Sequence, residues 1–119
     1  MLEDLTSVNR YHPSLYTAWK TLGNNVEYLR LGNIIFVRGN SLGTVTITNV
    51  STEYTRLGTL PSGYRPSSGF VTIGTGRNTN GGYIQIMIDY TGNIDAVALG
   101  TGGTSSYWGF MTSFPLPIV

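Results

Sequence analysis

Residues 83–89 alternate isoleucine with other side chains, which is the period of a β-strand with one buried face. Thr91-Gly92-Asn93 supplies turn residues directly after this run, and residues 94–99 form a second apolar run. Together these segments predict a β-hairpin. The core face of its first strand carries Ile84, Ile86 and Ile88.

The turn length decides how the two strands of this hairpin are paired. A two-residue turn would place Ile86 opposite Val97. A three-residue loop would place Ile86 opposite Ala98 and would set Asp89 against Asp95. Because like charges directly opposite each other are destabilising, we prefer the first register.

Short β-type runs recur along the chain, separated by Gly, Asn, Ser and Thr, and this punctuation predicts an all-β fold. Gly32-Asn33 between two such runs is typical of a tight hairpin turn. Pro115 and Pro117 should keep residues 114–119 out of a central strand, because proline cannot donate to the ladder. The other predicted strands span residues 16–22, 26–31, 34–39, 44–48, 54–60, 70–73 and 107–112.

The sequence Thr-Leu-Pro-Ser-Gly-Tyr-Arg-Pro at residues 59–66 predicts a rigid corner. Each proline fixes its own φ and favours an extended residue before it. Ser62-Gly63 should form the turn, with Gly63 at positive φ if the turn is of type II. We expect Tyr64 to pack and Arg65 to cap at this corner rather than to contact a ligand.

Composition narrows the class of protein. The chain has 119 residues, 40% of them apolar and only 11% charged, with no cysteine, which suits one folded domain without disulfides. A net charge of +1 from scattered side chains predicts no nucleic acid partner, and no apolar run is long enough to predict a membrane span. Eight or nine short strands in a chain of this size predict a sandwich or a small barrel. Residues 1–15 read as a lead-in or the remnant of a neck.

Side chains that could carry catalysis are sparse. His12 is the one histidine, and its place in the lead-in is more typical of a surface residue than of a base or ligand. Asp89 and Asp95 flank one turn and are the candidate acid–base pair, although two solvated carboxylates are the commoner arrangement. A calcium ion there would need six or more oxygen ligands. We therefore expect no enzyme activity, no cofactor and no metal site.

Aromatic residues make up 12% of the chain and are the remaining chemical signal. Tyr and Trp combine a flat apolar face with a polar edge, which suits sugar rings as well as cores. Trp19 is predicted to lie in the core. Tyr107 and Trp108 are adjacent on a predicted strand, so one of them should face outward.

Three segments, in this order, resemble the receptor-binding head domain of tail adhesins from phages of Gram-positive bacteria. The first runs from Trp19 through Tyr28 and Gly32-Asn33 to an apolar run that ends in Arg38-Gly39. The second is the corner at residues 60–66. The third is the hairpin of residues 84–99 with the closing aromatic strand, and the three cover most of residues 16–114.

This resemblance implies a jelly-roll-like antiparallel β-sandwich over residues 16–119, which would form a homotrimeric head on an upstream fibre or baseplate region. It also implies attachment to host cell-wall or surface polysaccharide without cleavage, and a location in the virion, at the tail tip or baseplate. Residues 1–4 are acidic and lack a signal peptide's apolar region, so we expect synthesis in the host cytoplasm.

The resemblance fixes no sugar-contacting residues, so the candidates come from side-chain chemistry. We expect Trp108 and Tyr107 to stack on sugar rings, and Arg77 and Asp95 to bond hydroxyls or pair a phosphate. Two alternatives remain open. The chain could be a structural module that binds only other phage proteins, or a glycan-depolymerising domain that uses Asp89 and Asp95.

Overall fold

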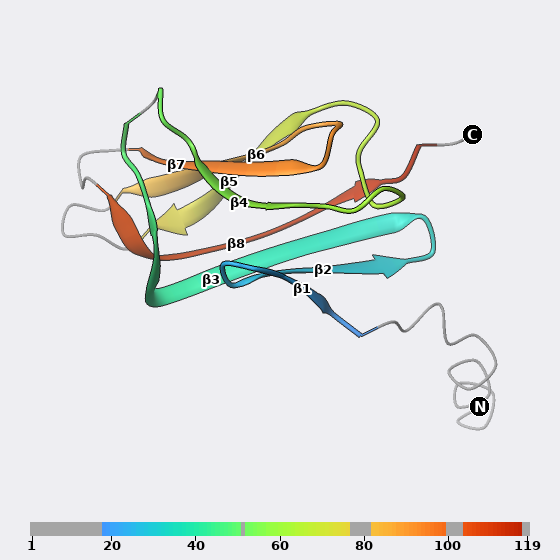
Figure 1. Ribbon diagram of the computed structural model, residues 1–119, viewed down its shortest axis with the longest axis horizontal. Coiled ribbons are helices and arrows are strands. Elements are labelled where there is room, and N and C mark those ends of the chain that lie inside the picture. The colour runs from blue at the N-terminus through green and yellow to red at the C-terminus, as the bar shows by residue number, and fades with distance from the viewer. Residues whose placement is uncertain (1–17, 51, 77–81, 100–103, 118–119) are drawn as a thin grey trace.

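The computed structural model describes residues 18–50, 52–76, 82–99 and 104–117. The predictions for residues 1–15, His12 among them, and for Arg77 lie outside the described residues. Within these segments the chain forms β-strands and no helix, and so no helix that could span a membrane (Figure 1). The strands are β1 (Lys20–Gly23), β2 (Val26–Leu31), β3 (Ile34–Ile47), β4 (Thr55–Thr59), β5 (Phe70–Gly76), β6 (Tyr83–Ile88), β7 (Asn93–Leu99) and β8 (Ser105–Pro115).

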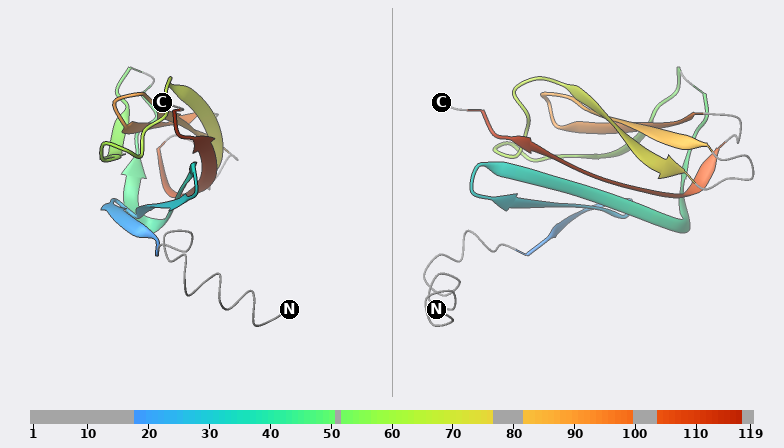
Figure 2. Two further views of the ribbon diagram at one scale, coloured as in Figure 1. Left: turned by 90° about the vertical axis from the view of Figure 1, so that its right-hand side faces the viewer. Right: turned by 180° about the vertical axis from the view of Figure 1, so that it is seen from behind.

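All eight strands belong to one antiparallel sheet, in the order β1-β2-β3-β8-β5-β6-β7-β4. The sheet rolls around its own interior until its two edge strands approach each other (Figure 2). At this seam the Asn24 side chain donates a 3.0 Å hydrogen bond to the Leu57 carbonyl, and Leu22 packs against Gly58. The all-β, jelly-roll-like antiparallel prediction is confirmed, with the opposed layers supplied by one rolled sheet.

The interior of the roll is filled by aliphatic and aromatic side chains. Ile84, Ile86 and Ile88 are fully buried, as the alternation predicts. The Trp108 and Phe110 rings stack with their centroids 6.1 Å apart. The other core residues are Val26, Tyr28, Ile35, Val37, Ile47, Leu57, Leu60, Ile94, Ala96, Ala98 and Phe114.

The register of the β6–β7 hairpin differs from both predicted registers. Ile86 pairs with Ala96 rather than with Val97 or Ala98. The loop comprises Tyr90, Thr91 and Gly92, because the Asp89 amide donates to the Asn93 carbonyl at 3.1 Å, and it begins one residue before the predicted three-residue loop. The Asp89 carboxylate accepts hydrogen bonds from the amides of Thr91 and Asn93, at 2.9 and 3.1 Å. A carboxylate that bonds to nearby backbone amides favours a turn that starts at its own residue, which Gly and Asn alone do not indicate.

Two strands run further than predicted. The runs predicted at residues 34–39 and 44–48 are one strand, β3, which bends where Gly43 has a φ of 104° and where pairing with β8 shifts. β8 is a central strand and continues to Pro115, against the prediction that residues 114–119 lie outside one. The proline is tolerated because Leu116 donates to the Asn33 carbonyl on the β3 side, so the nitrogen of Pro115 faces the other side, where β5 forms no pair with it.

The corner at residues 60–66 forms as predicted. Gly63 has a φ of 92°, and the Tyr64 amide donates to the Pro61 carbonyl at 3.1 Å, as in a type II turn. The Tyr64 ring packs edge-on against Tyr28, with centroids 5.1 Å apart. Arg65 donates through Nε to the Leu60 carbonyl at 2.8 Å, so its predicted capping role is confirmed.

Candidate functional site

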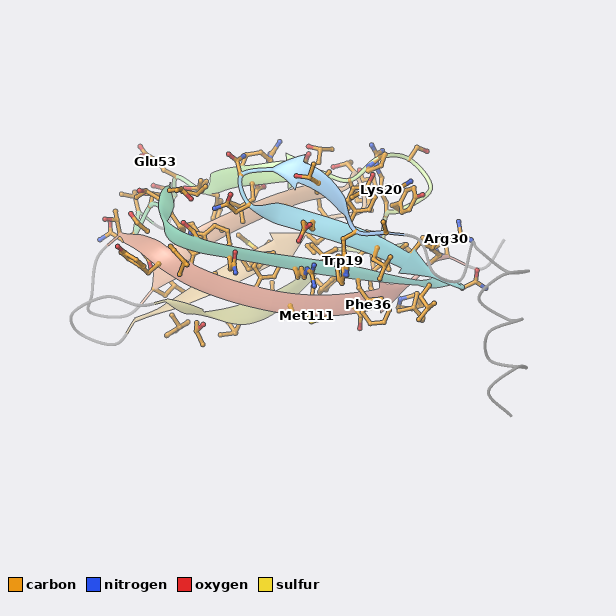
Figure 3. The ribbon with its side chains drawn as sticks, turned by 90° about the horizontal axis from the view of Figure 1, so that it is seen from below. Trp19, Lys20, Arg30, Phe36, Glu53 and Met111 are labelled. Atoms are coloured by element: carbon orange, nitrogen blue, oxygen red, sulfur yellow. The ribbon has the colours of Figure 1, made fainter. Side chains whose placement is uncertain are left out.

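A polar groove lies on the outward side of β2, β3 and β8, beside Met111, which Figure 3 labels. We call it the outer groove. Its cavity has a volume of about 370 Å³, near the low end of the ~300–1,000 Å³ typical of small-molecule sites. The side chains that line it are Asn25, Glu27, Arg38, Asn40 and Met111, with backbone from Gly39 and Phe110.

Arg38 is the most firmly positioned side chain of the outer groove. It lies opposite Glu27 across the β2–β3 ladder, and its Nε donates to a Glu27 carboxylate oxygen at 3.1 Å. Its guanidinium carbon lies 3.8 Å from the centre of the Trp19 ring, which is a cation–π contact. Contacts from two directions hold the guanidinium while much of the side chain stays exposed.

A second, smaller hollow adjoins the outer groove. It has a volume of about 230 Å³ and is lined on the outer face by Leu42, Thr75, Tyr107 and Gly109. Gly109 pairs with Asn40 on one side and with Thr75 on the other, so the hollow and the groove meet at this pair. Because Gly109 has no side chain, the outer surface of the sheet is recessed at this position.

An apolar stripe runs beside the groove across β8 and β5. It consists of Met111, Ile73 and Val71, whose exposed fractions are 60%, 59% and 53%. The β5–β8 ladder ends at the Thr75–Gly109 pair, and Ile73 and Met111 each lie two residues beyond it on their own strands. Exposed apolar patches next to polar rims commonly mark protein contacts.

The structure separates the two aromatic residues that were predicted to stack on sugars. Tyr107 is 44% exposed and lines the hollow, whereas Trp108 is 4% exposed and points into the core. The Trp108 indole donates to the Val45 carbonyl at 2.9 Å, and its ring faces Phe110. One of the pair faces outward as predicted, and the buried Trp108 ring offers neither of its faces to a sugar.

Asp95 has a protein partner away from the groove. On the β4–β7 side of the sheet its carboxylate forms an ion pair with Arg56. The hydrogen bond from Arg56, followed by the charge of Asp95, raises the pKa of the guanidinium above its ordinary value. Asp95 lies opposite Met87 in the ladder and so not directly opposite Asp89, whose carboxylate is bonded within its own turn. The pKa of Asp89 is lowered chiefly by the Thr91 hydroxyl, and the charge of this same Arg56 adds to the effect.

Asp89 is a structural carboxylate. Its oxygen accepts from the Thr91 hydroxyl at 2.5 Å and from the amides of Thr91 and Asn93. The Thr91 hydroxyl is the main cause that lowers the pKa of Asp89 below its ordinary value, and the two amides add to it against the opposing effect of burial. These bonds favour the ionised form.

Replacing Asp89 by asparagine should therefore reduce the fall in unfolding free energy between neutral and acidic pH. The folded pKa lies below the unfolded one, so the carboxylate stabilises the fold above pH ~4 and loses this contribution as the pH falls through the folded value. Urea denaturation at neutral and acidic pH measures the effect, with Glu53→Gln as the control at an exposed turn. Parallel pH profiles for the wild type and Asp89→Asn would contradict the assignment.

Sequence reasoning placed Trp19 in the core and did not select Arg38 or Glu27. Trp19 is half-buried and lies on the outside of β3, against Arg38 (Figure 3). The signal for the ion pair was present, because a tight turn at Gly32-Asn33 sets residue 27 opposite residue 38. Contact between Trp19 and Arg38 depends on the pairing of β1 with β2, which strand periodicity does not predict.

Among the described residues, no cluster of three or more His, Asp or Glu side chains is placed to hold a metal ion. The polar atoms of the outer groove are instead amides, one guanidinium and one carboxylate. This mixture can donate and accept hydrogen bonds over a shallow surface.

Comparison with known proteins finds a similar fold in a phage protein domain. The crystal structure of the head domain of phage bIL170, described among the receptor-binding domains of lactococcal phages, aligns with a TM-score of 0.63 and 21% sequence identity. The alignment covers 84% of this chain and 98% of that one. No protein-family model and no curated protein sequence matches the chain significantly. The fold implied by the sequence resemblance is thus confirmed.

Proposed function

We propose that the chain is the receptor-binding head of a phage tail fibre or baseplate and attaches to saccharide on a Gram-positive host surface without cleaving it. The observation that carries this proposal is the alignment with nearly the whole of a phage head domain described as receptor-binding. The head would lie at the tail tip of the virion, joined to an upstream fibre or baseplate region.

The outer face of β3 and β8 supports a saccharide as the receptor. Sugar hydroxyls need both donors and acceptors, and the outer groove offers them from Arg38, Glu27 and Asn40. Tyr107 adds a partly exposed ring at the adjoining hollow. Of the other predicted site residues, Asp95 pairs with Arg56 and Trp108 is buried, while Arg77 lies outside the described residues.

Binding without cleavage is supported by how the carboxylates are used. Glycoside hydrolysis needs two carboxyl groups that flank the scissile bond. Among the described residues, Glu27 is the only carboxylate that lines the outer groove, and it is already paired with Arg38. Asp89 and Asp95 each have their own partners, on a turn and on β4.

A homotrimer would bury the apolar stripe of Met111, Ile73 and Val71. These side chains are a liability in water and suit a surface that packs against a second copy. Since Met111 also lines the outer groove, each neighbouring subunit would stand at the edge of a saccharide site. Three weak sites in one particle would then act together.

Cell-wall binding tests this function directly. The purified chain should sediment with walls from at least one Gram-positive strain, release no reducing ends from them, and block adsorption of a phage that carries it. Heat-unfolded protein is the control. Retention on no wall from a broad panel would overturn the proposal. Retention that fails to block adsorption would favour a structural module, and release of reducing ends would favour the depolymerising alternative.

A further inference from the structure

The outer groove contains one positive and one negative side chain, and these are paired with each other. Arg38 and Glu27 are the only charged residues among those that line it in the described part of the chain. The amides of Asn25 and Asn40 are its other polar side chains. An arginine alone would favour anions, but here a carboxylate cancels its charge within the groove itself.

The pairing leaves hydrogen-bonding capacity for a ligand. Glu27 occupies Nε of Arg38, and within the described segments no protein acceptor bonds its two terminal nitrogens. The side-chain amide of Asn40 also has no protein partner among those residues, while its backbone amide is taken by the Asn25 carbonyl at 3.2 Å. Trp19 covers one face of the guanidinium, so its donors are held in a fixed plane.

Two adjacent hydroxyls match this pair better than an anion does. One hydroxyl can accept from the guanidinium of Arg38 while the other donates to the carboxylate of Glu27. A phosphodiester group or the carboxylate of a uronate offers only acceptors, and its charge would meet Glu27 at close range. The paired charges thus select for a group that is both donor and acceptor.

We infer that the outer groove binds an uncharged sugar unit through two adjacent hydroxyls and discriminates against phosphate- or carboxylate-bearing units. This inference rests on the saccharide binding proposed above and specifies the chemical class of the receptor. Because no net charge is neutralised on binding, affinity should change little between about 20 mM and about 500 mM salt.

Titration of the intact chain by nuclear magnetic resonance tests the ligand class. The probes are a panel of methyl glycosides of common hexoses and the 6-phosphates of the same sugars. The readouts are the Arg38 Nε–H and the Trp19 indole N–H signals. At least one methyl glycoside should shift both signals, with the corresponding sugar phosphate binding about tenfold more weakly or worse.

The variant Glu27→Gln keeps the size of the side chain and removes its charge. Affinity for the methyl glycoside should fall about three- to tenfold, since a charge-assisted acceptor is lost. Sugar phosphates should bind more tightly than to the wild type, and this binding should weaken with added salt. Arg56→Gln is the matched control, because Arg56 belongs to a separate ion pair, with Asp95, and lies outside the groove.

Two results would overturn the inference. One is a wild-type response of the groove signals to sugar phosphates and not to glycosides, and the other is a response to neither class. An unchanged preference in Glu27→Gln would also contradict the role given to the carboxylate. Sedimentation with cell walls, measured separately, decides the proposed function, so protein that binds walls through charged units would fail this inference alone.

Discussion

Replacing Gly74 by alanine should lower the unfolding temperature by roughly 10–20 °C, which corresponds to a loss of about 2–3 kcal/mol. An added Cβ would lie 2.4 Å from the Gly109 carbonyl oxygen, 2.8 Å from Phe110 Cβ and 2.9 Å from Ile84. The first contact is with backbone, so β5 and β8 would have to separate. Their pairs, Thr75–Gly109 and Gly76–Trp108, join the two halves of the sheet.

Gly109→Ala is the matched control for this prediction. It lies across the same ladder, but an added Cβ there meets nothing closer than 3.7 Å. Its unfolding free energy should stay within about 0.5 kcal/mol of the wild type. Thermal denaturation followed by circular dichroism compares the two variants, and equal melting temperatures would show that the close β5–β8 contact adjusts without cost.

The variant Ile73→Lys should leave the fold intact and abolish trimer-dependent attachment. A lysine at this exposed position of the apolar stripe would place like charges near one another at the proposed subunit contact. Loss of three-site binding should weaken retention on cell walls by about 100-fold or more. Light scattering and wall sedimentation measure assembly and attachment on the same sample.

Val50→Lys is the control for Ile73→Lys, because Val50 is also an exposed aliphatic residue but lies outside the stripe. It should remain trimeric and bind normally. If the wild type itself is a monomer, or if Ile73→Lys still assembles, the stripe is not the subunit contact. Wall binding by a monomeric Ile73→Lys at reduced avidity would leave the outer groove as the site.

The sequence predicts the strands of this protein better than it predicts which side chains come together on the surface. Alternation identifies the buried face of β6, and turn chemistry identifies the corner at Gly63, because each depends on a few neighbouring residues. The predicted register is wrong where Asp89 starts the turn one residue earlier, with its own carboxylate bonded to the turn amides. The sequence does not predict the outer groove for a different reason. Trp19 and Arg38 meet only when β1 pairs with β2 in the sheet.

Trp108 shows that residue type alone does not predict whether an aromatic side chain is buried or exposed. An aromatic residue near a strand end can serve a sugar or a core, and its indole hydrogen bond to Val45 becomes visible only when β3 and β8 are paired. Tyr107, one residue earlier, takes the opposite face of the same strand. Alternation predicts that the two residues differ, but it does not predict which of them faces solvent.

The central position of β8 has a consequence for biosynthesis. β3 and β5 are both made before β8, yet each depends on it as a neighbour in the sheet. While the ribosome is still adding residues 77–104, the finished strands leave unpaired edges and an uncovered core, a state that favours aggregation. Such long-range pairing also slows folding, so the outer groove, to which β8 contributes Met111, can be completed only after β8 has been synthesised.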